Sequence, residues 1–308
     1  MTKNHTGRSR RGRDHAESSS GQESSKGRSG SSASAYEDKG PLLPPEFAAA
    51  VQFSKYERNR IREHLATFYQ KELIVDVVRR IRAGKEATVY ACTGHPSTGR
   101  AVIAAKLYRE RSLRGARNAG EYQEGRAMLN NDGNEAGFHS HRHDWRGARE
   151  PKAADTQTSW LMHEFTLLQA LHAKGGDVPE PIAHAEHALL MEFIGDGTDA
   201  APMLNDVQLE AGEASQLFER VVFNIELMLQ LGWVHGDLSG YNLLYNQGRV
   251  VLIDFPQVVN SRNNPKARAI FERDVKRVAQ CFARDDGGID HELLAQQLWS
   301  KYVPDPAA

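Results

Sequence analysis

Apolar residues along the chain predict four helices. Between residues 53 and 69 they gather near one helical face with basic residues opposite, which is the pattern of an amphipathic helix. The apolar positions are Phe53, Tyr56, Ile61, Leu65 and Phe68. Longer stretches of helical character cover residues 159–171, 217–231 and 267–282. We expect the first helix to lead into a folded domain that contains the other three.

Shorter apolar runs, bounded by turn-forming residues, predict strands. These runs are residues 74–81, 87–91, 101–107, 188–195, 243–245 and 250–253. The last two flank a turn at Gly248, so a hairpin is expected there. The run at 188–195 ends at Gly195, which suggests a hinge.

Composition limits the class of protein. With 308 residues and 40% hydrophobic content, the chain can bury a sizeable core, as one bilobed domain or two small ones. The formal net charge of −1 points to no partner. The two cysteines, Cys92 and Cys281, lie far apart in apolar stretches and are expected to be reduced. No apolar run approaches the roughly 18 residues of a membrane span, so we expect a cytoplasmic protein without membrane contact.

The amino-terminal segment differs from the rest. Residues 1–45 are rich in Ser, Gly, Arg and Lys and nearly lack apolar side chains before Tyr36, so we expect them to be disordered. Basic residues at 8–13 suit RNA or ribosome contact through phosphate attraction, and a purely solubilising tail is equally open.

The rest of the chain is divided by its patterns into three parts. We expect a leading helix over 46–73, an amino-terminal lobe over 74–195 and a carboxy-terminal lobe over 196–308. A loop at about 109–155 interrupts the first lobe and is a candidate for closing over a substrate. It carries histidines at 139, 141 and 143, but without further matched ligands no structural metal is expected.

The most informative stretch runs from Trp233 to Phe255. Asp237 and Asn242 lie five positions apart in one polar loop, and the expected hairpin returns the chain to Asp254. Phosphoryl transfer from ATP needs one carboxylate to orient the nucleophile, and an amide oxygen and a second carboxylate to hold Mg²⁺. The three residues have the required types and order, whereas a lone Asp or Asn is usually a turn or cap residue.

Other residues are candidates for binding ATP itself. The turn at 83–86 would cover the phosphates with Gly84 and Lys85, and Lys106 at the end of a strand would reach them. Such a lysine needs a carboxylate on a following helix, and we choose Glu164 because residues 159–171 have strong helical character. Two glutamates at 121 and 124 come earlier but lie in a Gly- and Asn-rich region.

The connector after the fourth strand is the candidate for contacting adenine. In two-lobed nucleotide enzymes the backbone of such a connector hydrogen-bonds the adenine edge, which makes Glu192 and Ile194 the candidates. An ordinary core strand is the alternative.

Taken together, these motifs resemble the RIO family of atypical serine/threonine protein kinases, closest to its first and most widespread subgroup in a bacterial-type form. The resembling segments are 84–90 (GKEATVY), 106–108 (KLY), 163–165 (HEF), 178–181 (VPEP), 190–195 (LMEFIG), 201–204 (APML), 207–209 (VQL), 235–242 (HGDLSGYN) and 253–257 (IDFPQ). They occur in family order over about residues 74–283.

The resemblance implies a trimmed bilobal protein-kinase fold of the α+β class, with a mixed β-sheet lobe and a helical lobe around Mg-ATP. It implies that Asp237 is the catalytic base, that Asn242 and Asp254 bind Mg²⁺, and that Lys106 paired with Glu164 positions the phosphates. In this family the metal-binding aspartate can also accept the phosphoryl group during ATP hydrolysis, so Asp254 is the candidate aspartyl-phosphate. The expected partners are ATP and a protein substrate.

Several departures from ordinary kinases change the expected regulation. Gly236 stands where many kinases have an arginine before the catalytic aspartate, and Pro256 and Gln257 follow Asp254 and Phe255 in place of a glycine. No A-P-E motif follows. Control by activation-loop phosphorylation is therefore not expected. Ala83 replaces the family's usual Ser or Thr before the loop glycine, which removes one expected phosphate contact.

Two rival functions remain open on the sequence. The H-G-D-L-x-x-x-N pattern at 235–242 also resembles aminoglycoside and choline phosphotransferases, which act on small-molecule hydroxyls. The second rival is an ATP-gated assembly factor for ribosomal subunits in which kinase activity is incidental.

Overall fold

The computed structural model describes residues 43–48, 52–109, 153–282 and 288–304, all within one compact unit, Gly40–Ala308. Most of the expected tail, and the segment with the histidines at 139, 141 and 143, lie outside the described residues. None of the described helices is long and apolar enough to span a bilayer.

A five-stranded sheet forms the amino-terminal lobe, in the order β1-β2-β3-β5-β4. Its strands are β1 (Ile74–Ala83), β2 (Ala87–Gly94), β3 (Val102–Tyr108), β4 (Pro181–Ala185) and β5 (Ala188–Glu192). Every neighbouring pair is antiparallel, so the expected mixed sheet is wrong in this detail. The reason is that β4 lies at the far edge and the β4–β5 hairpin turns back beside β3. A 3-10 turn, η1 (Pro96–Thr98), joins β2 to β3.

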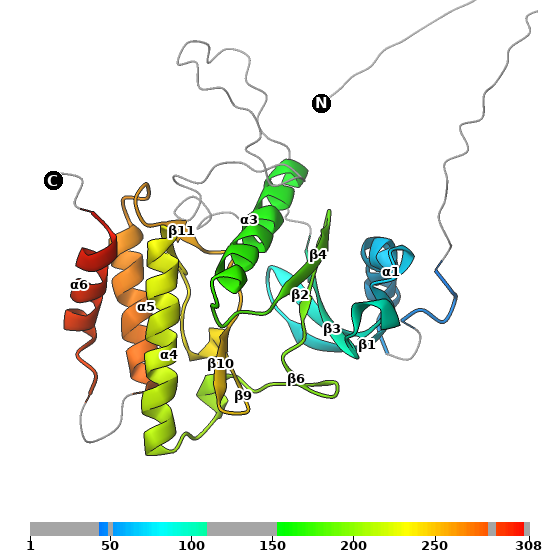
Figure 1. Cartoon of the computed structure of the whole chain (residues 1–308). Helices are drawn as coiled ribbons and strands as arrows, with labels where there is room; N and C mark the ends of the chain where they lie inside the picture. Colours follow the sequence, from blue (N-terminus) through cyan, green and yellow to red (C-terminus); the bar gives the residue numbers. More distant parts are fainter. Residues whose placement is uncertain (1–42, 49–51, 110–152, 283–287, 305–308) are drawn as a thin grey trace, which may run out of the picture. The chain divides into compact units, whose positions relative to one another are not determined.

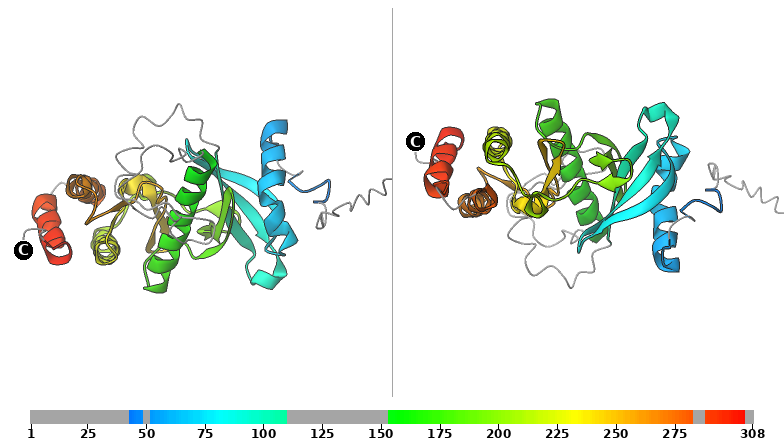
Figure 2. Two further views of the ribbon diagram at one scale, coloured as in Figure 1. Left: turned by 90° about the horizontal axis from the view of Figure 1, so that it is seen from above. Right: turned by 90° about the horizontal axis from the view of Figure 1, so that it is seen from below.

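Two helices cover the two faces of this sheet (Figures 1 and 2). Helix α1 (Lys55–Gln70) begins after Ser54, whose side chain accepts a hydrogen bond from the Glu57 amide. Its buried residues Ile61, Leu65 and Phe68 pack in one core cluster with Ile103 and Leu190 of the sheet. The amphipathic helix expected near residues 53–69 is therefore present.

Helix α3 (Ala153–Ala173) packs in a second core cluster with Leu189, the strand residue that precedes Leu190. Successive strand residues point to opposite faces, so Leu189 and Leu190 serve the two different clusters. Leu161 and Leu168 of α3 share their cluster with helices of the second lobe. This helix therefore connects the packing of the sheet with that of the helical lobe.

The helical lobe contains α4 (Ala211–Gln230), α5 (Ala267–Phe282) and α6 (His291–Tyr302), which lie side by side in Figures 1 and 2. Short elements connect them to the sheet. These are β6 (Gly195–Asp196), β7 (Asp199–Ala200), η3 (Leu204–Asp206), β8 (Trp233–Val234), η4 (Gly240–Asn242) and β11 (Val259–Asn260). The expected helix at 267–282 matches α5, and those at 159–171 and 217–231 lie within or near α3 and α4.

The expected hairpin is formed by β9 (Leu243–Asn246) and β10 (Arg249–Leu252). Gln247 and Gly248 turn the chain with φ of 51° and 77°. Positive φ at both central residues is typical of a tight hairpin turn whose twist matches the strands. Because the turn is tight, Ile253 returns to donate its backbone N–H to the Asn242 carbonyl at 3.0 Å. Asp254 is thereby placed next to the loop that carries Asp237 and Asn242.

Candidate active site

A cavity of about 500 Å³ lies between the sheet lobe and the β9–β10 hairpin. Its apolar walls include Val89, Ala104, Met191, Leu244 and Ile253. Polar groups gather at one part of the lining, where Lys106, Glu164 and Asp254 meet. A mainly apolar cavity with a few convergent polar groups is the usual form of a small-molecule site.

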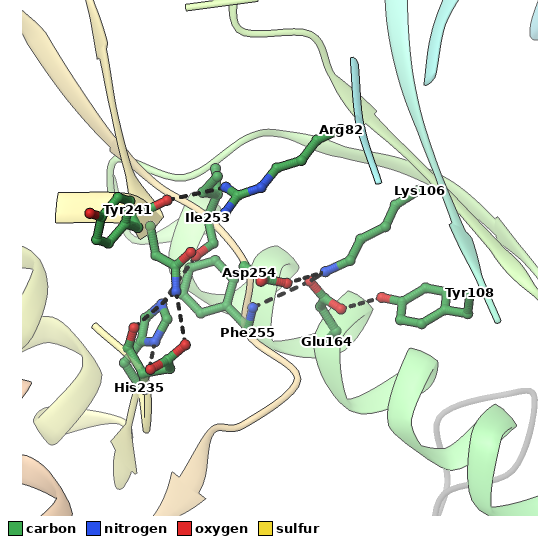
Figure 3. A network of polar contacts seen from close by, with 11 residues as sticks. Arg82, Lys106, Tyr108, Glu164, His235, Tyr241, Ile253, Asp254 and Phe255 are labelled. Atoms are coloured by element: carbon green, nitrogen blue, oxygen red, sulfur yellow. Dashed lines mark hydrogen bonds and ion pairs between the residues drawn. The ribbon is translucent and has the colours of Figure 1, made fainter. Parts of the chain in front are cut away.

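Lys106 is the centre of the polar cluster (Figure 3). Its Nζ donates to Glu164 Oε1 at 2.7 Å and to Asp254 Oδ1 at 2.8 Å. The Lys106 and Glu164 side chains are only 6% and 2% exposed, whereas that of Asp254 is 46% exposed. The structure therefore brings Lys106 together with the glutamate chosen from the sequence and with the candidate metal ligand.

The charges of this cluster stabilise one another. Burial by itself lowers the pKa of Lys106, but the negative charges of Asp254 and Glu164 outweigh it and the pKa is raised. The Lys106 charge in turn lowers the pKa of Asp254. Asp254 has a φ of 69°, a left-handed conformation that costs a non-glycine residue about 1–2 kcal/mol. The Lys106 contact helps to hold it there.

Tyr108 is a supporting residue to which the sequence analysis gave no role. Its hydroxyl donates a short hydrogen bond to Glu164 Oε2, and the Phe255 amide donates to Glu164 Oε1 at 3.4 Å. Figure 3 shows Tyr108 and Lys106 reaching Glu164 from the same strand. Two residues apart on a strand, they share one sheet face, which is a signal that the sequence contains.

Asp237 and Asn242 lie beside this cavity in one loop. Asn242 Nδ2 donates to the Asp237 carbonyl oxygen at 2.9 Å and approaches Asp237 Oδ2 at 3.4 Å. Asp237 Oδ1 accepts from Arg277 of α5 at 2.9 Å. The two residues are thus linked directly, and Arg277 is an additional partner of Asp237.

The backbone before Asp237 is held tightly by two distant segments. The Gly236 amide donates to Asp274 Oδ2 of α5 at 2.7 Å. Gly236 has a φ of 86°, and a Cβ there would lie 2.1 Å from the Gln257 carbonyl oxygen. A larger residue, such as the arginine of many kinases, does not fit. Asp274 is 2% exposed and supports the loop through this hydrogen bond. Burial raises the pKa of its carboxyl.

His235 supports the same loop as a neutral imidazole. Its Nε2 lies 3.2 Å from the Ile253 carbonyl oxygen, and its Nδ1 lies 3.3 Å from the Asp237 amide. The carbonyl needs a donor and the amide needs an acceptor, which assigns the proton to Nε2. Burial lowers the pKa of His235, although Asp274, Asp254 and Asp237 oppose the shift. Protonation of Nδ1 would break the contact with the Asp237 amide.

Acidification is therefore expected to destabilise the protein through His235. Because its pKa in the folded state lies below the ordinary 6.5, the unfolded chain takes up the proton first. The free energy of unfolding should fall as pH drops below about 6.5, until the lowered folded pKa is passed. Chemical denaturation between pH 7.5 and pH 5 should show a shallower loss for His235→Gln than for the wild type.

The exposed His172 provides the matched control for this measurement. His172→Gln should retain the pH dependence of the wild type. The raised pKa of Asp274 makes the free energy of unfolding rise on acidification, which is opposite to the His235 effect. Asp274 is present in the wild type and in both variants. Parallel curves for the wild type and His235→Gln would contradict the assignment.

The remaining candidates for binding ATP line the cavity at two other places. Gly84 and Lys85 are exposed in the β1–β2 turn, which the Gly84 amide closes by donating to the Ala87 carbonyl at 2.8 Å. Glu192 and Ile194 lie at the connector between the lobes. The Ile194 carbonyl accepts from Ala201 at 2.9 Å, so its N–H is the group to consider for a ligand.

The donor set fits a magnesium ion. Carboxylate and amide oxygens are ligands that Mg²⁺ accepts, usually one or two from the protein with phosphates completing the shell. Asn242 uses its Nδ2 on Asp237, which leaves Oδ1 for a metal, and the Asp254 carboxylate is half-exposed. Among the described residues no group of three or more His, Cys, Asp or Glu is arranged to hold a metal by protein ligands alone.

Comparison with known proteins points to the same family as the sequence motifs. A family model described as RIO domain matches residues 89–293. The chain is 31% identical over 214 residues to the RIO-type serine/threonine-protein kinase Rio1 of Haloferax volcanii, covering 70% of this chain and 66% of the relative. It is 28% identical over 249 residues to human serine/threonine-protein kinase RIO1, covering 80% and 40%. The chain thus spans less than two thirds of the length of these relatives.

A solved structure supports the fold class. The crystal structure of a Rio2 kinase-ADP/Mg²⁺-phosphoaspartate complex from Chaetomium thermophilum superposes with a TM-score of 0.51 at 20% identity, covering 80% of this chain and 70% of that one. The α+β fold with a sheet lobe and a helical lobe is therefore confirmed.

Proposed function

The chain belongs to the RIO family, and from this premise we propose that it is an ATP- and Mg²⁺-dependent serine/threonine protein kinase of the RIO type. The observation that carries the proposal is the convergence of Lys106, Glu164 and Asp254 at a cavity beside the Asp237–Asn242 loop. Each side chain has the type that phosphoryl transfer requires. The relatives named above as serine/threonine kinases support the substrate class.

Each residue has a role in this proposal. Lys106, held by Glu164, positions the phosphates, and Gly84 and Lys85 cover them from the β1–β2 turn. The Glu192 carbonyl and the Ile194 amide bind the adenine edge. Asn242 and Asp254 hold Mg²⁺, which when bound neutralises charge on the phosphates.

Transfer itself relies on Asp237. The acceptor oxygen of a Ser or Thr bonds to the γ-phosphorus while the bond from that phosphorus to the ADP oxygen breaks. The hydroxyl proton passes to the Asp237 carboxylate. Asp237 Oδ1 is engaged by Arg277, which directs this role to Oδ2.

Asp254 has a second proposed role as acceptor of the phosphoryl group. Its carboxylate is 46% exposed, and Lys106 contacts it through Oδ1 at 2.8 Å. In that case Oδ2 bonds to the γ-phosphorus, ADP leaves, and water later hydrolyses the acyl phosphate. The phosphoaspartate in the Rio2 kinase complex from Chaetomium thermophilum supports this chemistry.

Labelling with γ-³²P-ATP and Mg²⁺ tests both roles. Label on protein that survives acid and mild hydroxylamine is expected for phosphoserine or phosphothreonine, and it should disappear in Asp237→Ala. A hydroxylamine-labile fraction should disappear in Asp254→Ala. No labelled protein and no ATP consumption by the wild type would contradict the proposed function.

The two rival functions predict different experimental outcomes. A labelled small-molecule hydroxyl in place of labelled protein would indicate a phosphotransferase of the aminoglycoside or choline type. Nucleotide-dependent co-sedimentation with ribosomal particles would indicate an assembly factor, with contact through the basic tail at residues 1–45. We keep this RNA or ribosome contact as a hypothesis.

The RIO subgroup and the cellular location of the protein are also proposals. We propose the first RIO subgroup because the Haloferax volcanii and human relatives are named Rio1 and RIO1. A cytoplasmic location agrees with the two free cysteines, Cys92 and Cys281, since reduced thiols are usual there.

A further inference from the structure

Arg277 of α5 contacts the carboxylate that the proposed reaction uses as its base. Its Nη1 donates to Asp237 Oδ1 at 2.9 Å, across 40 positions of sequence. The Arg277 and Asp237 side chains are 41% and 42% exposed. Both side chains are therefore partly open to solvent, so an acceptor hydroxyl can reach the Asp237 carboxylate.

Helix α5 is fixed against this loop by neighbouring contacts. The Asp274 carboxylate accepts the Gly236 amide at 2.7 Å, and the Arg273 guanidinium donates to the Gly236 carbonyl oxygen. Arg277 follows Asp274 by three positions and so lies on the same helical face, one turn further along. Both residues on that face bind consecutive residues of the loop, Gly236 and Asp237. The register between helix and loop is thereby set at two points.

The positive charge beside Asp237 comes from a residue outside the catalytic loop. The residues between Asp237 and Asn242 are Leu238, Ser239, Gly240 and Tyr241, none of which is a cation. Lys106 is engaged by Glu164 and Asp254. The guanidinium of Arg277 supplies a positive charge at the base, from a helix that follows the loop in sequence.

Stability is a poor explanation for this pair. Ion pairs as exposed as this one contribute little to folding, because water screens them and two long side chains lose freedom. A fixed orientation of the carboxylate has a larger consequence for catalysis, since small misplacements of reacting groups slow a reaction strongly. Arg277 holds Oδ1 while the Asn242 amide lies 3.4 Å from Oδ2, so the carboxylate is oriented from two sides.

We propose that Arg277 is a positioning residue that orients the Asp237 carboxylate for proton acceptance from the substrate hydroxyl. This inference rests on the proposed function. During transfer the acceptor oxygen bonds to the γ-phosphorus, ADP departs, and the proton passes to Asp237 Oδ2 while Arg277 retains Oδ1. Arg277 acts through Asp237, so its effect exists only when that carboxylate is present.

Steady-state kinetics of the full chain with a phosphoacceptor protein test this assignment. Arg277→Met should lower kcat by about 10-fold to 100-fold, because the base loses its orientation. KM for ATP and the thermal midpoint should stay near wild-type values. Arg277→Lys should recover part of kcat, since it restores the charge without the planar fork. Added guanidinium ion at millimolar concentration should partly rescue Arg277→Met.

Arg268 provides the matched control on the same helix. Its Nε binds Glu272 Oε1 at 3.0 Å in an exposed ion pair. Arg268→Met removes an exposed arginine of α5 that binds a neighbouring turn of its own helix. It should leave kcat, KM and thermal midpoint unchanged.

A double-mutant cycle separates positioning through Asp237 from an independent role. In an Asp237→Asn background, Arg277→Met should cause no further loss of kcat. Equal fold-losses in both backgrounds would overturn the inference, as would an Arg277→Met variant with wild-type kcat. A wild-type protein that transfers no phosphate refutes the proposed function and this inference with it. An active wild type with an equally active Arg277→Met refutes the inference alone.

Discussion

Replacement of Asp237 by alanine is expected to reduce protein phosphorylation by at least about 100-fold, and by up to about 10⁴-fold, with little change in the Kd for Mg-ATP. Asp237 contacts Asn242 and Arg277 but is not part of the cavity lining. Its loss therefore removes the proposed proton acceptor and leaves the walls of the proposed nucleotide site in place. Equilibrium binding of a fluorescent ATP analogue and rates of label transfer measure the two effects separately.

Asp199 is a suitable control for this substitution. Its carboxylate accepts from Arg79 Nη1 at 2.5 Å, and its side chain is 83% exposed. Asp199→Ala thus removes a carboxylate that pairs with an arginine, and it should retain full transfer. Undiminished phosphorylation by Asp237→Ala would show that the base has been assigned to the wrong residue.

Replacement of Lys106 by methionine should weaken nucleotide binding itself. Loss of a charged hydrogen-bond donor to the phosphates should raise the Kd for Mg-ATP by about 10-fold to 100-fold. The same substitution leaves Glu164 as a buried carboxylate without its cation, so a loss of about 3 kcal/mol in the free energy of unfolding is expected. Calorimetric titration with ATP and chemical denaturation measure these changes.

A second variant separates the two consequences of losing Lys106. Glu164→Gln added to Lys106→Met removes the unpaired charge, so stability should recover in part while ATP binding remains weak. Lys301→Met is the control, because Lys301 forms an exposed pair with Glu226 at 2.9 Å. Wild-type affinity in a folded Lys106→Met protein would exclude Lys106 from the site.

Local sequence pattern was sufficient for most elements of the fold. Helix α5 was predicted with its observed bounds, and the β9–β10 hairpin followed from two apolar runs around Gly248. Short-range periodicity and turn residues determine such elements, because their hydrogen bonds join residues close in sequence. The direction of pairing in the sheet was not predictable in this way. It depends on where β4 returns after α3, a long-range feature.

The residues of the candidate site show the same difference between local and long-range features. Asp237, Asn242 and Asp254 were found from sequence because one loop and one tight hairpin place them together. Lys106 and Glu164, 58 positions apart, were paired only by assuming a two-lobed architecture, and the structure brings them within 2.7 Å. The roles of these residues, like those of Gly84, Lys85, Glu192 and Ile194, stay predictions until the variants are measured.

What the sequence determined by itself was the set of chemical groups and their local order. These groups are two aspartates, an asparagine and a lysine, on elements whose apolar periodicity requires burial. Only the tertiary structure decided which distant groups meet them. Tyr108 at Glu164, Asp274 beneath Gly236 and Arg277 at Asp237 are such contacts. The physical reason is that side-chain contacts across 38 to 56 positions depend on the register between packed elements. That register results from the packing of the hydrophobic core clusters, which local pattern does not encode.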